Sequence, residues 1–200
     1  RPDERHAKFS DLEPLKNLLS KFENKEFNVE GYPSDFFVKK VIEVKPDQVT
    51  LVPDPPGALT SSFGWDCETN KNLLTDIVSE FKKNDIRVSI FINPSIKTLE
   101  NLEIIQTDRV ELYTFDYAHT FNENKEKAIK DYIDVTNYLK KEFPKIELNA
   151  GHDLNLENLK FFLDKINNIK EVSIGHALIC DTFEFGLQET IKKYLTLTNN

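Results

Sequence analysis

The stretch RVSIFI at positions 87–92 is short, rich in Val, Ile and Phe, and followed directly by Asn93 and Pro94. Such a run is typical of a strand that is buried on both faces of a parallel sheet. The next apolar run, RVELY, lies at 109–113. The segment before RVSIFI carries apolar residues at helical spacing: Leu74, Ile77, Val78 and Phe81. The pattern around 87–92 is therefore helix, strand, connection, strand.

The same alternation extends over the whole chain. Helices are expected between the strands, and the longest of them covers about 123–143. The last helix has an apolar stripe that we expect to face inward, formed by Leu187, Ile191, Tyr194 and Leu195. Six runs predict strands: 27–29, 48–52, 87–92, 109–113, 146–149 and 171–174. Alternation this regular indicates βαβ units on a parallel sheet.

An open doubly wound sheet and a closed barrel both fit this alternation. The Gly-rich phosphate loops of nucleotide-binding sheets, GxGxxG and GxxxxGK[ST], do not occur in the sequence. That favours the barrel. We therefore predict an α/β fold, a TIM (β/α)8 barrel with about six of its eight βα units present, in a single domain over 1–200.

The composition excludes several classes of protein. Hydrophobic residues make up 39% and charged residues 30%, which is ordinary for a soluble globular fold. The net charge of −8 argues against a nucleic-acid partner or an anionic membrane surface. No apolar run approaches the roughly 18 residues of a membrane span. Cys67 and Cys180 lie far apart and outside any CxxC motif, which favours two reduced thiols and a cytoplasmic location.

Two carboxylates lie at or near predicted strand ends, where parallel barrels carry their function. Glu30 follows the apolar run at 27–29, so partial desolvation would fit it for a general base. It could equally stabilise the start of the next helix. Glu111 lies inside the strand at 109–113, where an ionised carboxylate is costly unless it is paired or used. A buried salt bridge to Arg87 or Arg109 is the structural alternative.

Two histidines share one local pattern, a Gly followed by His just past a strand. They are His152 in NAGH and His176 in IGHA, where Gly175 precedes it. A single histidine of this kind is more often structural than catalytic. Two of them after the last two strands favour a functional site, because the loops there commonly bind phosphate in barrels.

The chain opens on a dense polar segment that contains Arg1, Arg5 and His6. A solvated run of charges is the usual explanation, but in a loop at the barrel rim Arg can bind phosphate. The sequence contains no Met, which leads us to expect a fragment that has lost its first segment. No predicted strand end carries the Lys that a Schiff-base aldolase requires, and no standard metal-binding motif is present.

Several strings together resemble the pyridoxine 5′-phosphate synthase family. They are RPDERH at 1–6, KPDQVTLVPD at 45–54, VSIFI at 88–92, VELYT at 110–114, NAGH at 149–152 and SIGHA at 173–177. The resemblance implies a TIM barrel that assembles as an octamer of paired dimers. It also implies condensation of 1-deoxy-D-xylulose 5-phosphate with 3-amino-2-oxopropyl phosphate, without a metal or an organic cofactor.

The resemblance assigns roles in the first half of the chain. Arg1 and His6 would hold the deoxyxylulose phosphate, with help from Thr60 in the loop after 48–52. Glu30 would be a general base, and Glu111 would stabilise charge in the transition states.

In the second half, His152 would be the general acid. Gly175 and His176 would bind the phosphate of the amino-ketone, partly through backbone N–H groups. Asp153 departs from the family, which often has Gly there. Its N–H could still contact phosphate, but its carboxylate would repel that group.

The front of the chain departs further. The family's first strand and the end of its second strand carry substrate-contacting and catalytic residues that have no counterpart here. The domain at 1–200 is thus expected to lack the first strand, the first helix and most of the second strand. Unpaired strand edges lead us to expect the 200-residue chain alone to be inactive and poorly soluble.

Two other readings stay open. A metal-dependent sugar-phosphate aldolase or epimerase could use His152, His176 and a carboxylate as ligands. A degenerate barrel could bind a phosphorylated metabolite without turning it over.

Overall fold

The computed structural model describes residues 2–54, 57–58 and 60–198. Its contacts divide the chain into two compact units. The first comprises Arg1–Asn93 and Lys97–Glu111, and the second comprises Pro94–Ile96 and Leu112–Asn200. Each unit is described by itself below.

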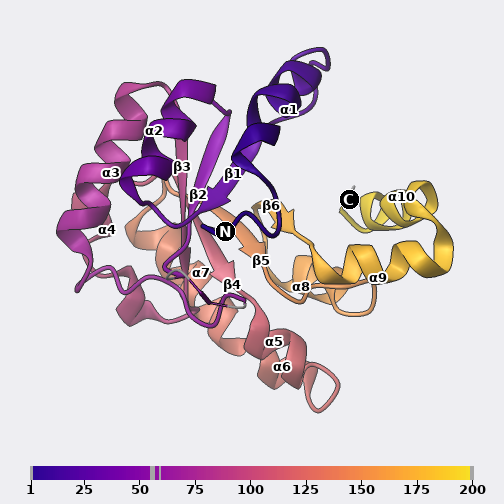
Figure 1. The fold of residues 1–200 in the computed structure, drawn as a ribbon. Coiled ribbons are helices and arrows are strands. Elements are labelled where there is room, and N and C mark those ends of the chain that lie inside the picture. The colour runs from indigo at the N-terminus through magenta and orange to yellow at the C-terminus, as the bar shows by residue number, and fades with distance from the viewer. Residues whose placement is uncertain (1, 55–56, 59, 199–200) are drawn as a thin grey trace. The chain divides into compact units, whose positions relative to one another are not determined.

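The first unit is built on β1 (Asn28–Gly31), β2 (Gln48–Leu51) and β3 (Arg87–Ile92). β1 pairs with β2 and β2 with β3, both in parallel. β4 (Arg109–Tyr113) begins in this unit and ends in the second. The helices, coloured indigo to magenta in Figure 1, are η1 (Phe9–Asp11), α1 (Leu12–Leu19), α2 (Asp35–Val44), α3 (Lys71–Lys83), η2 (Ile96–Leu99) and α4 (Leu102–Ile105).

The strands of the first unit are buried in the way that a parallel sheet requires. Every residue of β2 and of β4 is buried, as expected where both faces of a parallel sheet are covered. The amino ends of the strands are joined by polar side chains. Arg87 Nε donates to Gln48 Oε1 at 2.8 Å, and Gln48 Nε2 donates to Asn28 Oδ1 at 3.2 Å. Arg109 Nη1 also donates to Gln48 Oε1, at 2.9 Å. These bonds satisfy polar groups that would otherwise be costly to bury.

The second unit contains β5 (Glu147–Gly151) and β6 (Ile169–Ser173), which pair in parallel with an irregularity between Leu148 and Asn149. Its helices are α5 (Phe115–Thr120), α6 (Lys125–Ala128), α7 (Lys130–Glu142), α8 (Leu159–Lys165), α9 (His176–Phe185) and α10 (Leu187–Thr198).

An aromatic cluster forms the centre of the second unit. The ring centroid of Phe162 lies 5.0 Å from that of Tyr117 and 5.5 Å from that of Tyr132. Both hydroxyls find buried carbonyl acceptors: Tyr117 donates to Asn158 O at 2.6 Å and Tyr132 to Tyr113 O at 2.9 Å. Burial raises the pKa of both phenols, so they act here as hydrogen-bond donors and not as acids.

This cluster yields a stability prediction. Phe162→Ala should lower the free energy of unfolding by about 3–5 kcal/mol, because the ring is fully buried and leaves a cavity. Phe183, on α9, is 89% exposed and provides a matched control. Urea unfolding of the complete protein measures both variants, and equal losses from the two would contradict the assignment of the core.

The observed elements confirm the predicted fold class, and the strands are neighbours in chain order from β1 to β6. β3 and β4 have the predicted bounds, whereas β1 extends to Gly31 and so includes Glu30. The predicted helix at 123–143 is divided at Ile129 into α6 and α7. The inward stripe expected of the last helix is wrong for three of its four residues, since only Tyr194 is buried and the exposed ones are Leu187, Ile191 and Leu195. Within the described part of the chain, no helix is both long and apolar enough to cross a bilayer.

Candidate active site

Glu30 lies in the first unit as the third residue of β1, opposite Thr50 of β2. Its side chain is exposed, so the partial desolvation expected from the sequence is not observed. Gly31 follows it, and a Cβ at this position would lie only 2.3 Å from the ring of Phe37. The Phe37 ring thus packs directly against the carboxyl end of β1, and a larger residue at position 31 would require this ring to move.

A cavity of about 70 Å³ lies beside Glu30. The end of β1 lines one side, and the N-terminal segment contributes Pro2, Ala7, Lys8 and Phe9. Glu4 holds this segment in place by accepting the N–H of Phe9 at 2.8 Å. The segment that contains His6 therefore lies next to the carboxyl end of β1. The cavity alone is smaller than the roughly 300–1,000 Å³ of most small-molecule sites.

The loop after β2 carries Thr60, whose side chain is exposed. The indole N–H of Trp65 donates to Leu51 O at 2.9 Å, which ties the loop to the end of β2. Gly64 ties it to the residue after β3, because its N–H donates to Asn93 Oδ1 at 2.9 Å. A Cβ on Gly64 would come within 2.4 Å of the backbone at Ile92 and Asn93. Only Gly permits this close approach.

Glu111 is 2% exposed and is the last residue of the first unit. The two arginines considered as its structural partners both donate to Gln48 Oε1. Arg87 also forms an ion pair with Glu26, and this hydrogen bond is the main reason why the pKa of Glu26 is lowered. Glu111 is buried, as its place in the strand predicts, and an ionised carboxylate there is costly unless it is paired or used.

In the second unit, the end of β5 is fastened to the end of β4 by Thr114. The Thr114 N–H and hydroxyl both donate to Gly151 O, at 2.9 and 2.8 Å, and the hydroxyl also reaches His152 O. His152 and Asp153 then adopt positive φ angles of 93° and 58°. Residues other than Gly rarely adopt such angles, and they persist where the surrounding structure enforces them, often at functional sites.

The imidazole of His152 is largely buried, with 15% of the side chain exposed. The Tyr113 ring packs against it edge-on, with centroids 4.8 Å apart. The side chain of Asp153 lies between His152 and His119: Asp153 Oδ1 is 3.4 Å from His152 Nδ1, and Oδ2 is 3.0 Å from His119 Nε2.

Gly175 and His176 stand at the start of α9, two residues beyond β6. Both are exposed, and apart from Gly175 and its two chain neighbours no described residue comes within 4 Å of the place where a Cβ on Gly175 would be. The first N–H groups of a helix point outward and the helix dipole favours an anion there. Because Gly151 of β5 is paired with Ser173 of β6, His152 and the start of α9 follow the same edge of this pair of strands.

The structure thus groups the predicted residues within each unit. The segment around His6 lies beside the β1 end that carries Glu30, while His152, Asp153, Gly175 and His176 follow the ends of β5 and β6. Arg1 lies outside the described residues. His119 was missed, although its place six residues after β4 is where barrels carry functional side chains. Among the described residues, no group of three His, Cys, Asp or Glu side chains could hold a metal ion.

These elements and side chains define an α/β enzyme of the (β/α)-barrel class, with carboxylates and imidazoles at its strand ends. Solved structures support the fold. 3-Keto-L-gulonate-6-phosphate decarboxylase from Vibrio cholerae matches 94% of this chain and 79% of its own, with a TM-score of 0.60 and 10% identity. The tryptophan synthase alpha-subunit from Pyrococcus furiosus matches 96% and 74%, with a TM-score of 0.60 and 14% identity.

The model of the family "Pyridoxal phosphate biosynthesis protein PdxJ" matches residues 1–200, and the chain belongs to this family. Pyridoxine 5′-phosphate synthase from Cytophaga hutchinsonii is 48% identical over 195 residues, which are 98% of this chain and 79% of that protein. The synthase from Parabacteroides distasonis is 47% identical over 200 residues, covering 100% of this chain and 82% of that protein. The resemblance found in the sequence is confirmed.

Proposed function

We propose that the protein condenses 1-deoxy-D-xylulose 5-phosphate with 3-amino-2-oxopropyl phosphate to form pyridoxine 5′-phosphate, with release of phosphate and water. Membership of the PdxJ family supports the activity. The observation in the structure that carries the proposal is the pairing of β5 with β6, which puts the imidazole of His152 and the open N-terminus of α9 at one edge.

The chemistry of the condensation needs the groups that the strand ends supply. Joining an amine to a ketone expels water, and a general acid assists that loss by protonating the departing oxygen. We assign this role to His152. Forming the ring's carbon–carbon bond requires a proton to be removed from carbon, and we assign that step to Glu30. Glu111 would stabilise charge that develops between these steps.

The phosphate groups of the substrates need separate anchors. Gly175 and His176 would bind the phosphate of the amino-ketone through the N–H groups at the start of α9 and the imidazole. Arg1, His6 and Thr60 would hold the deoxyxylulose phosphate, and the Asp153 N–H would face substrate. Assembly as an octamer of paired dimers and a cytoplasmic location belong to the same proposal and rest on the family resemblance.

A turnover assay with a chelator tests the proposed reaction. The complete protein, mixed with both substrates, should form pyridoxine 5′-phosphate at the same rate with and without EDTA, as followed by mass spectrometry. Loss of turnover on chelation would instead support the metal-dependent aldolase or epimerase. Tight binding of either substrate without product would support the degenerate barrel.

The phosphate anchor gives a second test. His176→Asn should raise the KM for 3-amino-2-oxopropyl phosphate by roughly 10- to 100-fold, which corresponds to losing one hydrogen bond to a charged group. The KM for the other substrate should change little. Lys192→Gln on α10, which removes an exposed charge, is the control. If His176→Asn raised only the KM for 1-deoxy-D-xylulose 5-phosphate, the result would contradict the assignment.

A further inference from the structure

The Asp153 cluster, which consists of His119, Asp153 and His152, is not explained by the roles assigned so far. Its carboxylate lies between two imidazoles, 3.0 Å from His119 Nε2 and 3.4 Å from His152 Nδ1. The residues come from α5 and from the turn after β5, all within the second unit. The contact with His119 is a hydrogen bond, whereas Asp153 Oδ1 lies within ion-pair distance of His152 Nδ1.

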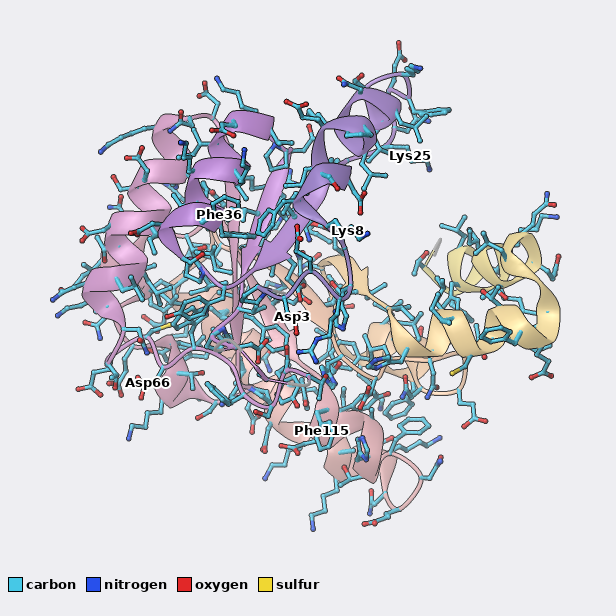
Figure 2. The ribbon with its side chains drawn as sticks, viewed as in Figure 1. Asp3, Lys8, Lys25, Phe36, Asp66 and Phe115 are labelled. Atoms are coloured by element: carbon cyan, nitrogen blue, oxygen red, sulfur yellow. The ribbon has the colours of Figure 1, made fainter. Side chains whose placement is uncertain are left out.

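Aromatic packing holds both imidazoles in place. The ring of Phe115, labelled on α5 in Figure 2, stacks on His119 with centroids 3.9 Å apart and an interplanar angle of 27°. The centroid of the same ring lies 5.8 Å from that of His152, and the interplanar angle of 64° makes this an edge-on contact. Phe115 thus touches both histidines.

The backbone around Asp153 is held as well. Asn158 Nδ2 donates to Asp153 O at 3.2 Å, and the φ of 58° lies in the left-handed region that Asp tolerates better than most residues. The side-chain exposures differ along the cluster: 55% for His119, 27% for Asp153 and 15% for His152. The carboxylate therefore links an exposed imidazole to a buried one.

A neutral imidazole carries its proton on one nitrogen, and the group that accepts from one nitrogen decides the role of the other. The negative charge of a carboxylate 3.4 Å from Nδ1 favours the form of the ring that carries a proton there, and the rings of Tyr113 and Phe115 pack against the imidazole. The carboxylate also stabilises the imidazolium, which is the form that donates a proton as a general acid. Nε2 of His152 would then be the atom that faces substrate.

We propose that Asp153 is a positioning residue for His152, and that His119 holds the Asp153 carboxylate in place. The inference rests on the proposed function, in which His152 is the general acid. The proposal also explains how a carboxylate can lie near a phosphate site. The charge of Asp153 is directed toward the two imidazoles, and this limits its repulsion of the substrate phosphate.

The experiment compares three variants of the complete protein. Asp153→Gly removes the carboxylate and suits a positive φ, so the backbone is preserved. We expect kcat to fall roughly 10- to 100-fold with little change in either KM, as for other carboxylate partners of functional imidazoles. Asp153→Asn keeps one acceptor oxygen, so its kcat should be higher than that of Asp153→Gly. Asp134→Asn, at an exposed position of α7, is the control for a lost carboxylate and should leave kcat unchanged.

His119 is tested by two replacements. Gln can still donate an N–H to Asp153, whereas Ala cannot. His119→Gln should therefore keep more of the kcat than His119→Ala does. Equal activity of the two, at the level of the unaltered protein, would remove His119 from the inference.

A spectroscopic measurement separates this inference from the proposed function. In ¹⁵N-labelled protein, the ring nitrogens of His152 should report a proton on Nδ1, and Asp153→Gly should abolish that preference. An unchanged His152 signal in Asp153→Gly would overturn the positioning role, even if His152→Asn abolishes turnover. Normal turnover of His152→Asn would instead overturn the proposed acid while leaving the tautomer result standing.

Discussion

His152→Asn should lower kcat by roughly 10²–10⁴-fold, the range that a general acid contributes, while substrate binding stays nearly unchanged. Asn cannot donate a proton to a departing oxygen, so the loss of water would proceed without its acid catalyst. Asn is also among the residues best suited to a positive φ, and the φ of His152 is 93°. The replacement therefore adds little backbone strain. Steady-state kinetics with both substrates measure the effect.

The control for His152→Asn is structural. Thr114 bonds to the backbone carbonyls of Gly151 and His152 and not to the imidazole, so the turn should persist in the variant. Its thermal midpoint should match that of the unaltered protein. A folded variant with the original kcat would exclude His152 as the acid.

Glu30→Gln should lower kcat by a similar factor, roughly 10²–10⁴-fold. Gln has the shape of Glu but cannot accept a proton at neutral pH, so the deprotonation of carbon would lose its base. Since Glu30 is exposed at the end of β1 and Gln keeps its size and shape, the fold should be unaffected. Turnover at saturating concentrations of both substrates is the measurement.

Glu23→Gln is the matched control for Glu30→Gln, because Glu23 is an exposed carboxylate in the segment between α1 and β1. It should keep full activity. If Glu30→Gln and Glu23→Gln have the same kcat, Glu30 is not the base.

The strands could be predicted where local composition reflects burial. β3 and β4 have the predicted bounds because nearly all of their residues are buried, which makes the apolar runs easy to recognise. β1 is longer than predicted because its pairing with β2 continues through Glu30 and Gly31, opposite Thr50 and Leu51. That pairing is a tertiary interaction, and local composition does not report it.

The helices show the same limit. Periodicity over 123–143 does not reveal the break at Ile129. This residue separates α6 from α7, and its side chain is fully buried. An apolar stripe likewise does not say whether it is covered, as the exposed Leu187 and Leu195 of α10 show.

The positions of the candidate residues could be predicted as far as polar side chains follow strand ends. Glu30 lies near the end of β1, and His152 and His176 follow β5 and β6, as the sequence indicated; their roles stay predictions. The position of His119 after β4 could have marked it as a candidate, but its contact with Asp153 could not be predicted, because it joins residues 34 positions apart. The positive φ of Asp153, which directs its carboxylate, is a property of the folded turn.

A crystal structure of the protein with 3-amino-2-oxopropyl phosphate bound would show whether the start of α9 and His152 form one substrate site. The phosphate should accept hydrogen bonds from the N–H groups at the start of α9, beside His176, and Nε2 of His152 should face the ketone. A phosphate bound away from α9, or an imidazole of His152 turned from the ligand, would contradict this prediction.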